Sequence, residues 1–143
     1  DATAAALAGG APAVATPDVR DVLARIRPGD YVAICAYLPR DTASITKLRA
    51  LRHRLRTRYA AATTVGFGPR FLHSTGQLHK GGPDSAVVLQ LVDEPVADLA
   101  IPGAAYGFAE LLAAQAAGDL ASLVARGRRV ARVSLQELEA ALA

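Results

Sequence analysis

The chain has 143 residues, a length that suits one domain with a buried core. Hydrophobic residues make up 52% of it, which excludes an intrinsically disordered protein, and no uninterrupted apolar run approaches the ~20 residues of a membrane-spanning helix. The formal net charge of +3, carried by 14 Arg and 2 Lys against 13 acidic residues, does not by itself indicate a nucleic-acid-binding protein.

The N-terminal composition and the cysteine content predict where the domain begins and where in the cell the protein is found. Residues 1–16 are rich in Ala, Gly and Pro, which is typical of a flexible linker or domain boundary, so we expect the domain to occupy residues 17–143. The sequence contains no methionine, which predicts that it is a piece of a longer chain. Cys35, the single cysteine, lies in an apolar run, so we expect a buried thiol, no internal disulfide and a cytoplasmic protein. The N-terminus carries Asp1 and no basic segment before an apolar one, so we expect no secretory signal.

The first helix and strand follow the linker. Residues 17–26 predict a helix that ends at Pro28 and Gly29. Residues 31–38, YVAICAYL, are apolar almost throughout, as in a strand that is covered on both faces of a parallel sheet.

Residues 42–59 predict a second helix, capped by Asp41 or Thr42, with apolar residues on one stripe and basic residues on the other face. The basic residues that we place on this face are Lys47, Arg49, Arg54, Arg56 and Arg58. No aromatic residues interleave these charges, so a solvated surface is favoured over a surface that binds nucleic acid or phosphate.

The remaining elements alternate between strands and helices. In chain order we expect strands at 62–68 and 85–92, a short extended piece at 99–101, helical pieces at 105–117 and 120–126, a strand at 129–135 and a last helix. Gly118 is expected to separate the two helical pieces, with Asp119 capping the second, and Ser134 and Glu137 predict a capping box for the last helix. This alternation, with strands buried on both faces, predicts an α/β fold, a three-layer αβα sandwich with a mainly parallel sheet.

The stretch FLHSTGQLHKGGPD, residues 71–84, holds most of the candidate functional groups. It follows a predicted strand, and open parallel sheets bind ligands where loops leave the carboxyl ends of strands. The candidates are His73 and His79 for proton transfer, Lys80 and Arg70 for an anion, and Ser74, Thr75 and Gln77 for hydroxyl groups. We expect these groups to converge in one water-filled cleft that binds a small, polyhydroxylated, anionic ligand.

Other kinds of site fit this stretch less well. Two histidines six positions apart, with no second cysteine, are too few ligands for zinc, and we expect no metal. No nucleophile-elbow pattern surrounds Ser74, and the glycines match neither dinucleotide-binding nor phosphate-loop spacing. A polar loop whose histidines only satisfy backbone groups remains the alternative.

The same stretch resembles a known family. TTVGFGPRFLHSTGQLHKGGPDSAVVLQL is similar to part of the glucose-6-phosphate isomerase half of bifunctional transaldolase/phosphoglucose isomerase proteins. The flanking segments IRPGDYVAICAYLP and IPGAAYGFAELLAAQAAGDLASLVARGRRVARVSL resemble that half too, in the same order. The resemblance covers residues 19–135.

The resemblance implies a sugar isomerase (SIS) domain, a flavodoxin-like sandwich that is the second of two such domains. It implies interconversion of glucose 6-phosphate and fructose 6-phosphate through an enediolate, without metal or organic cofactor. His73 and His79 would then transfer protons or open the sugar ring, while Lys80 and Arg70 stabilise negative charge. The implied partners are the sugar phosphate, an upstream SIS domain, a transaldolase domain and a second copy in a homodimer; no nucleic acid and no membrane are expected.

Two departures from the family keep a non-enzymatic interpretation open. Phosphoglucose isomerases use a glutamate as the C2 base, and no Glu lies between Tyr59 and Asp93, although Glu94 and Glu110 follow. More distant isomerases carry a lysine near the C-terminus, where this chain has Arg126, Arg128 and Arg129. The alternatives are a non-catalytic module that binds sugar phosphates or supports assembly, and a nucleic-acid-associated domain that uses the arginine-rich helix. The isolated chain is expected to be inactive if the site needs both domains.

Overall fold

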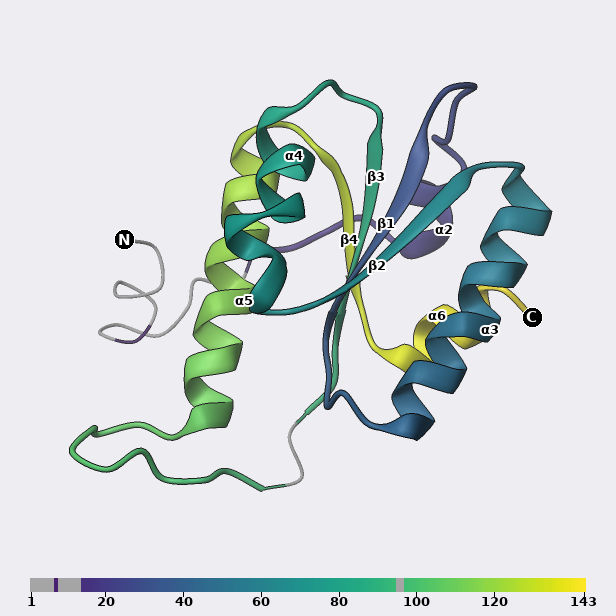
Figure 1. The fold of residues 1–143 in the computed structure, drawn as a ribbon. Helices are drawn as coiled ribbons and strands as arrows, with labels where there is room; N and C mark the ends of the chain where they lie inside the picture. Colours follow the sequence, from purple (N-terminus) through teal and green to yellow (C-terminus); the bar gives the residue numbers. More distant parts are fainter. Residues whose placement is uncertain (1–6, 8–13, 95–96) are drawn as a thin grey trace.

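The structure is a computed structural model that describes residue 7, residues 14–94 and residues 97–143. Its centre is a four-stranded parallel sheet with helices on both faces (Figure 1). In spatial order the strands are β2 (Ala62–Phe67), β1 (Tyr31–Tyr37), β3 (Ala86–Val92) and β4 (Arg129–Val133). The predicted α/β fold with a parallel sheet is therefore confirmed.

The helices form two layers around the sheet (Figure 1). One face is covered by α2 (Val19–Leu23), α3 (Thr42–Tyr59) and α6 (Leu135–Ala141), and the other by η1 (Arg70–His73), α4 (Thr75–Gly81) and α5 (Phe108–Ala125). Alternate residues of each strand enter two separate cores because successive side chains of a strand point to opposite faces. In β1, Val32, Ile34 and Ala36 join the α3 side, and Ala33, Cys35 and Tyr37 join the α5 side.

Helix α3 matches its predicted bounds and its predicted apolar stripe. Asp41 caps it, accepting a hydrogen bond from the Ser44 backbone amide at 2.7 Å. Leu48, Leu51 and Leu55 are buried against the sheet, as their helical spacing predicted.

Helix α5 differs from the prediction. It runs unbroken through Gly118, and Asp119 lies buried inside it instead of capping a second helix. A glycine within a helix costs only about 1 kcal/mol relative to alanine, and burial of Leu120 and Leu123 against the sheet outweighs that cost. By its length and composition alone this helix could cross a membrane, but in the structure it packs on one face of the sheet.

Smaller differences concern the ends of elements. The first helix, α2, is shorter than the predicted helix at residues 17–26. It spans five residues, Val19–Leu23, and Asp18 caps it. Residues 99–101 form no strand, and only an isolated bridge joins Ala100 to Gly107. The predicted capping box of Ser134 and Glu137 is present at α6. The expected linker, residues 1–16, lies outside the described residues except for residue 7 and residues 14–16.

Candidate functional site

The polar stretch after β2 is helical, not a loop. Elements η1 and α4 carry it from the carboxyl edge of the sheet, where strands end, back to the amino edge, where β3 begins (Figure 1). Residues at the start and at the end of the stretch therefore lie near opposite edges. The prediction that its seven polar side chains converge in one water-filled cleft is wrong, because the helix separates them along the height of the sheet.

His79 lies inside the protein. Its side chain is buried, and its Nδ1 lies 2.8 Å from the hydroxyl of Tyr31 at the start of β1. Burial lowers the pKa of His79, although the nearby Asp119 carboxylate opposes this, and burial raises the pKa of Tyr31. A neutral imidazole sealed against a tyrosine does not reach a ligand in solvent, so the structure gives His79 a structural place and not the catalytic place that we expected.

Lys80 is also withdrawn from solvent. Its Nζ lies 2.7 Å from Oδ1 of Asp119, and the side chains are 13% and 2% exposed. The hydroxyl of Tyr37 donates to Oδ2 of the same carboxylate at 3.2 Å. Burial raises the pKa of Tyr37, and the Asp119 carboxylate adds to the effect. Lys80 therefore neutralises a buried charge under α5 and is not placed to meet an anionic ligand.

The buried network continues across the sheet. Gln90 of β3 donates to the Ala116 carbonyl oxygen at 2.9 Å and lies 3.5 Å from Oδ2 of Asp119. Its own amide oxygen accepts from Nε of Arg132 at 2.8 Å. Sequence reasoning missed Asp119 and Gln90 because each lies in an apolar run, where one polar residue gives no sign of its partners.

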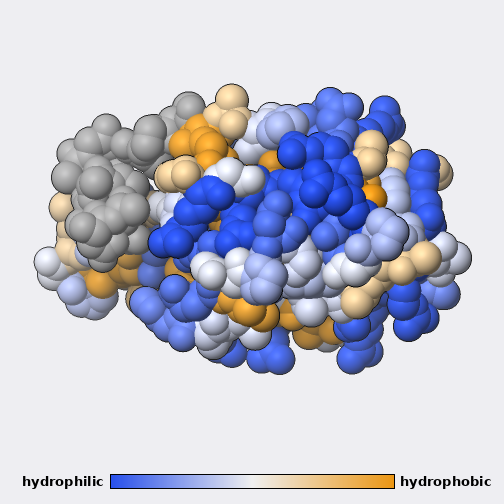
Figure 2. All heavy atoms as spheres, turned by 90° about the horizontal axis from the view of Figure 1, so that it is seen from above, coloured by the Kyte–Doolittle hydropathy of each residue, from blue (hydrophilic) through white to orange (hydrophobic). Residues whose placement is uncertain are grey.

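Arg128 and Arg129, which follow α5, hold the amino edge together. Arg128 donates to the carbonyl oxygens of Lys80 and Gly82 at 2.7 and 2.6 Å, which satisfies the last turn of α4. The buried Arg129 donates to the Asp84 carbonyl oxygen at 2.7 Å and forms an ion pair with Asp30. The hydrogen bond from Arg129 to the Asp30 carboxylate lowers the pKa of Asp30. Hydrophilic side chains cover much of this edge (Figure 2). Neither arginine is free to replace a catalytic lysine.

A different group of side chains meets at the carboxyl edge. Arg40, which follows β1, and Arg70 and Ser74, which follow β2, line a hollow of about 330 Å³ together with Val65, Phe67 and Phe71. Arg40, Arg70 and Ser74 are all exposed, and the Arg40 guanidinium lies 5.9 Å from the centre of the Phe67 ring. Two guanidinium groups and a hydroxyl at the carboxyl edge of a parallel sheet form an anion-binding arrangement.

Comparisons with known proteins support the fold alone. No family model matches the chain, and no curated protein matches it. The chain is similar to one solved structure, the crystal structure of a hypothetical protein from Thermus thermophilus. The TM-score is 0.69 and the identity is 18%, over 86% of this chain and 37% of that one. The chain thus spans little more than a third of the length of that protein.

The other predicted residues, His73, Thr75 and Gln77, are exposed but do not line the hollow at Arg40 and Arg70. His73 ends η1 between Arg70 and Ser74 and is exposed, as are Thr75 and Gln77 of α4. The Ser74 hydroxyl donates to the Phe71 carbonyl oxygen at 3.3 Å. The Gln77 amide nitrogen donates to the Leu72 carbonyl oxygen at 2.6 Å.

Arg40 was missed from the sequence, although its place directly after a buried strand is the signal that could have identified it. Among the described residues no group of three His, Cys, Asp or Glu side chains is placed to hold a metal ion.

Proposed function

We propose that this chain is the C-terminal SIS domain of a cytoplasmic glucose-6-phosphate isomerase and forms one wall of a site completed by a preceding domain. The observation that carries the proposal is the hollow between Arg40, Arg70 and Ser74 at the carboxyl edge of the parallel sheet. The identity of the proposed substrates, glucose 6-phosphate and fructose 6-phosphate, comes from the resemblance of residues 19–135 to the isomerase half of the bifunctional family.

The hollow suits the charged end of a sugar phosphate. Its volume of about 330 Å³ falls at the lower end of the ~300–1,000 Å³ typical of small-molecule pockets. Guanidinium groups bind phosphate oxygens with two parallel hydrogen bonds, and the Ser74 hydroxyl could donate a further one only by giving up its long 3.3 Å hydrogen bond to the Phe71 carbonyl oxygen. The phosphate would therefore lie between Arg40 and Arg70.

His73 is the remaining candidate for proton transfer on this chain. It is exposed and adjoins Ser74 in the chain, whereas His79 is buried against Tyr31 and Lys80 is largely withdrawn from solvent in its ion pair with Asp119. An imidazole next to a bound sugar phosphate would open the ring or return a proton to the enediolate. The C2 base would come from the preceding domain or from Glu94 or Glu110, which are both exposed.

The need for a second domain follows from the exposure of the site. Arg40, Arg70 and His73 all lie on the surface, and proton transfer at a sugar carbon needs water excluded and groups fixed in position. The isolated chain should bind a sugar phosphate weakly and turn over slowly or not at all.

The test is a coupled assay of fructose 6-phosphate conversion by the full-length protein that contains this chain. Arg70→Gln should raise KM about tenfold or more by removing a charge-assisted hydrogen bond. His73→Ala should lower kcat by about a hundredfold. The control is Arg25→Gln, which changes an exposed arginine that follows α2 and lies outside the hollow, and it should leave both constants unchanged. Unchanged turnover in both Arg70→Gln and His73→Ala would remove the proposed isomerase roles.

A non-catalytic sugar-phosphate-binding module is the second candidate. It is favoured by one observation, the burial of two of the three predicted catalytic residues, His79 and Lys80. In that case the full-length protein would show a thermal shift with 6-phosphogluconate that Arg70→Gln abolishes, yet no conversion of fructose 6-phosphate.

A further inference from the structure

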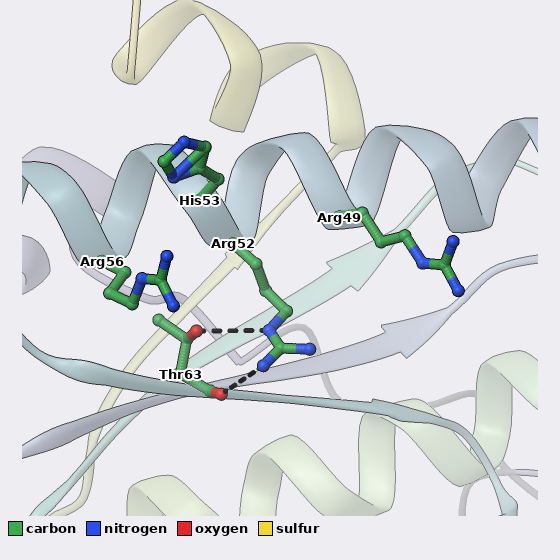
Figure 3. A pocket seen from close by; sticks show the side chains of 5 residues that line it. All are labelled: Arg49, Arg52, His53, Arg56 and Thr63. Carbon is green, nitrogen blue, oxygen red and sulfur yellow. Dashed lines mark hydrogen bonds between the residues drawn. The ribbon is translucent and has the colours of Figure 1, made fainter.

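A second cationic hollow lies between helix α3 and the edge strand β2. Arg49, Arg52, His53 and Arg56 from the helix and Thr63 from the strand surround a volume of about 180 Å³ (Figure 3). The Arg56 side chain reaches toward Arg52 and Thr63, whereas the His53 ring, at the rim of the hollow, and the Arg49 guanidinium both point away from Thr63 (Figure 3). The centre of the hollow is therefore the trio of Arg52, Arg56 and Thr63.

Charge is distributed unequally between α3 and the rest of the chain. The helix carries six Lys and Arg residues and no carboxylate, while the remaining residues carry ten Lys and Arg against thirteen Asp and Glu. Within residues 14–94 and 97–143, every ion pair involves Lys80, Arg128 or Arg129, so none neutralises a cation of α3. We predicted a solvated surface for this face and did not include Arg52 in it, although the structure places Arg52 at the hollow.

Arg52 is held in place over the strand. Its Nε donates to the Thr63 hydroxyl at 3.3 Å, and its Nη2 donates to the Thr63 carbonyl oxygen at 3.2 Å (Figure 3). These hydrogen bonds reduce the rotamer freedom of the Arg52 side chain. They use Nε and Nη2, and within the described residues no hydrogen bond involves Nη1, which can donate to a ligand. Arg56 follows one helical turn later, ~6 Å along the axis. Two guanidinium groups that approach each other without a carboxylate repel, and a bound anion would remove that repulsion.

From this geometry we infer that Arg52, Arg56 and Thr63 form a binding site for a phosphate group, separate from the hollow at Arg40 and Arg70. The volume of about 180 Å³ exceeds the ~30 Å³ share of one water and stays below the ~300 Å³ of a typical small-molecule pocket. It accommodates a phosphate group better than a whole sugar. The inference does not depend on isomerase activity.

The test is calorimetric titration of the protein with inorganic phosphate at low, constant chloride, using Arg70→Gln as background so that the other hollow contributes less. Arg52→Gln and Arg56→Gln should each weaken binding about tenfold, the effect of one charge-assisted hydrogen bond. Arg54→Gln is the matched control: it removes the same charge from the same helix but lies outside the hollow, and it should change affinity less than twofold. Far-ultraviolet circular dichroism checks that each variant is folded.

Two outcomes overturn the inference. One is an equal loss of affinity in Arg54→Gln, which would show a general charge effect without a site. The other is the absence of phosphate binding together with binding of a short single-stranded oligonucleotide that all three variants weaken alike, which would make α3 a nonspecific nucleic-acid surface. Selective loss in Arg52→Gln and Arg56→Gln supports the site.

Discussion

At the residue scale, the buried pair of Lys80 and Asp119 is the most consequential contact. Removing one partner of a buried ion pair leaves the other charge without compensation, which costs about 3–5 kcal/mol. We therefore expect Lys80→Met to lower the free energy of unfolding by about that amount, measured by urea denaturation.

The chain offers a matched control for this substitution. Its only other lysine, Lys47, is exposed on α3, and Lys47→Met should change stability by about 0.5 kcal/mol or less. The double variant Lys80→Met/Asp119→Leu should recover much of the loss because no buried charge remains. A Lys80→Met protein as stable as Lys47→Met would contradict the buried pair.

His79 predicts a specific pH dependence. Burial lowers the pKa of His79 in the folded protein below its ordinary 6.5, so the unfolded chain binds more protons there. The stability that neutral His79 contributes is complete above pH 6.5 and is lost as pH falls through the lowered pKa of the folded state. The free energy of unfolding should therefore decrease from pH 7.5 to pH 5 less steeply in His79→Gln than in the unmodified protein.

The carboxylates with a lowered pKa do not interfere in this window. Asp30, which Arg129 stabilises in its charged form, and the helix-capping Asp41 lose their contributions only as pH falls below their ordinary pKa of 3.8, and Glu137 of the α6 capping box only below its ordinary pKa of 4.5. Replacement of the exposed His53 by Gln provides the control. A slope in His53→Gln as shallow as that in His79→Gln would assign the pH dependence to histidine titration in general.

Residue types in the polar stretch do not reveal which of its side chains have partners inside the protein. The sequence shows that His79 and Lys80 are close along the chain, yet their partners Tyr31 and Asp119 are 48 and 39 positions away. A helical register decides which side chains of α4 face the sheet, and nothing local distinguishes a buried lysine from a ligand-binding one. Arg70 and Ser74 kept their predicted place because they lie directly where the chain leaves β2.

At the element scale, we expect two alanine-to-glycine substitutions, one at the end of α3 and one within it, to change the stability of the protein in opposite directions. Ala60 closes this helix in the left-handed conformation with φ of 50°, which costs a residue other than glycine about 1–2 kcal/mol. Ala60→Gly should therefore stabilise the protein. The same change at the exposed Ala50, within the helix, should destabilise it by about 0.5–1 kcal/mol.

Thermal and urea unfolding of the two glycine variants measures this pair. A lower free energy of unfolding for Ala60→Gly, similar to that of Ala50→Gly, would show that the left-handed conformation carries no strain.

The sequence predicts the strands of the sheet, whereas it does not predict helix α4. A strand with both faces buried is apolar at every position, as in β1 and β3, and that signal is strong in a short segment. Helix α4 has only seven residues and includes Gly76 and Gly81. A Cβ at Gly76 would lie 2.8 Å from the Phe71 carbonyl oxygen, so this glycine serves close packing of α4 on η1 and not the freedom of a loop.

At the scale of the whole molecule, the order of the strands explains why two cationic hollows share one side. Strand β2 lies at the edge of the sheet, and only β1 pairs with it. Thr63 borders the hollow of α3, and Val65 and Phe67 border the hollow at the carboxyl edge. Thr63 and Phe67 are four residues apart, ~13 Å along an extended strand. Each hollow thus occupies its own stretch of β2.

This spacing predicts that the two sites bind independently. At an ionic strength of 0.15 M the Debye length is about 8 Å, shorter than the ~13 Å between Thr63 and Phe67 along β2, so we expect the charges near these two ends to be largely screened from each other. Mutations that far apart without shared partners add within about 0.3–0.5 kcal/mol. Arg56→Gln and Arg70→Gln, alone and together, should therefore change the affinity for 6-phosphogluconate additively, with almost all of the loss in Arg70→Gln. A coupling energy above about 1 kcal/mol in this double-mutant cycle would show that a single ligand contacts both ends of β2, and the two hollows would then be one extended anion-binding surface.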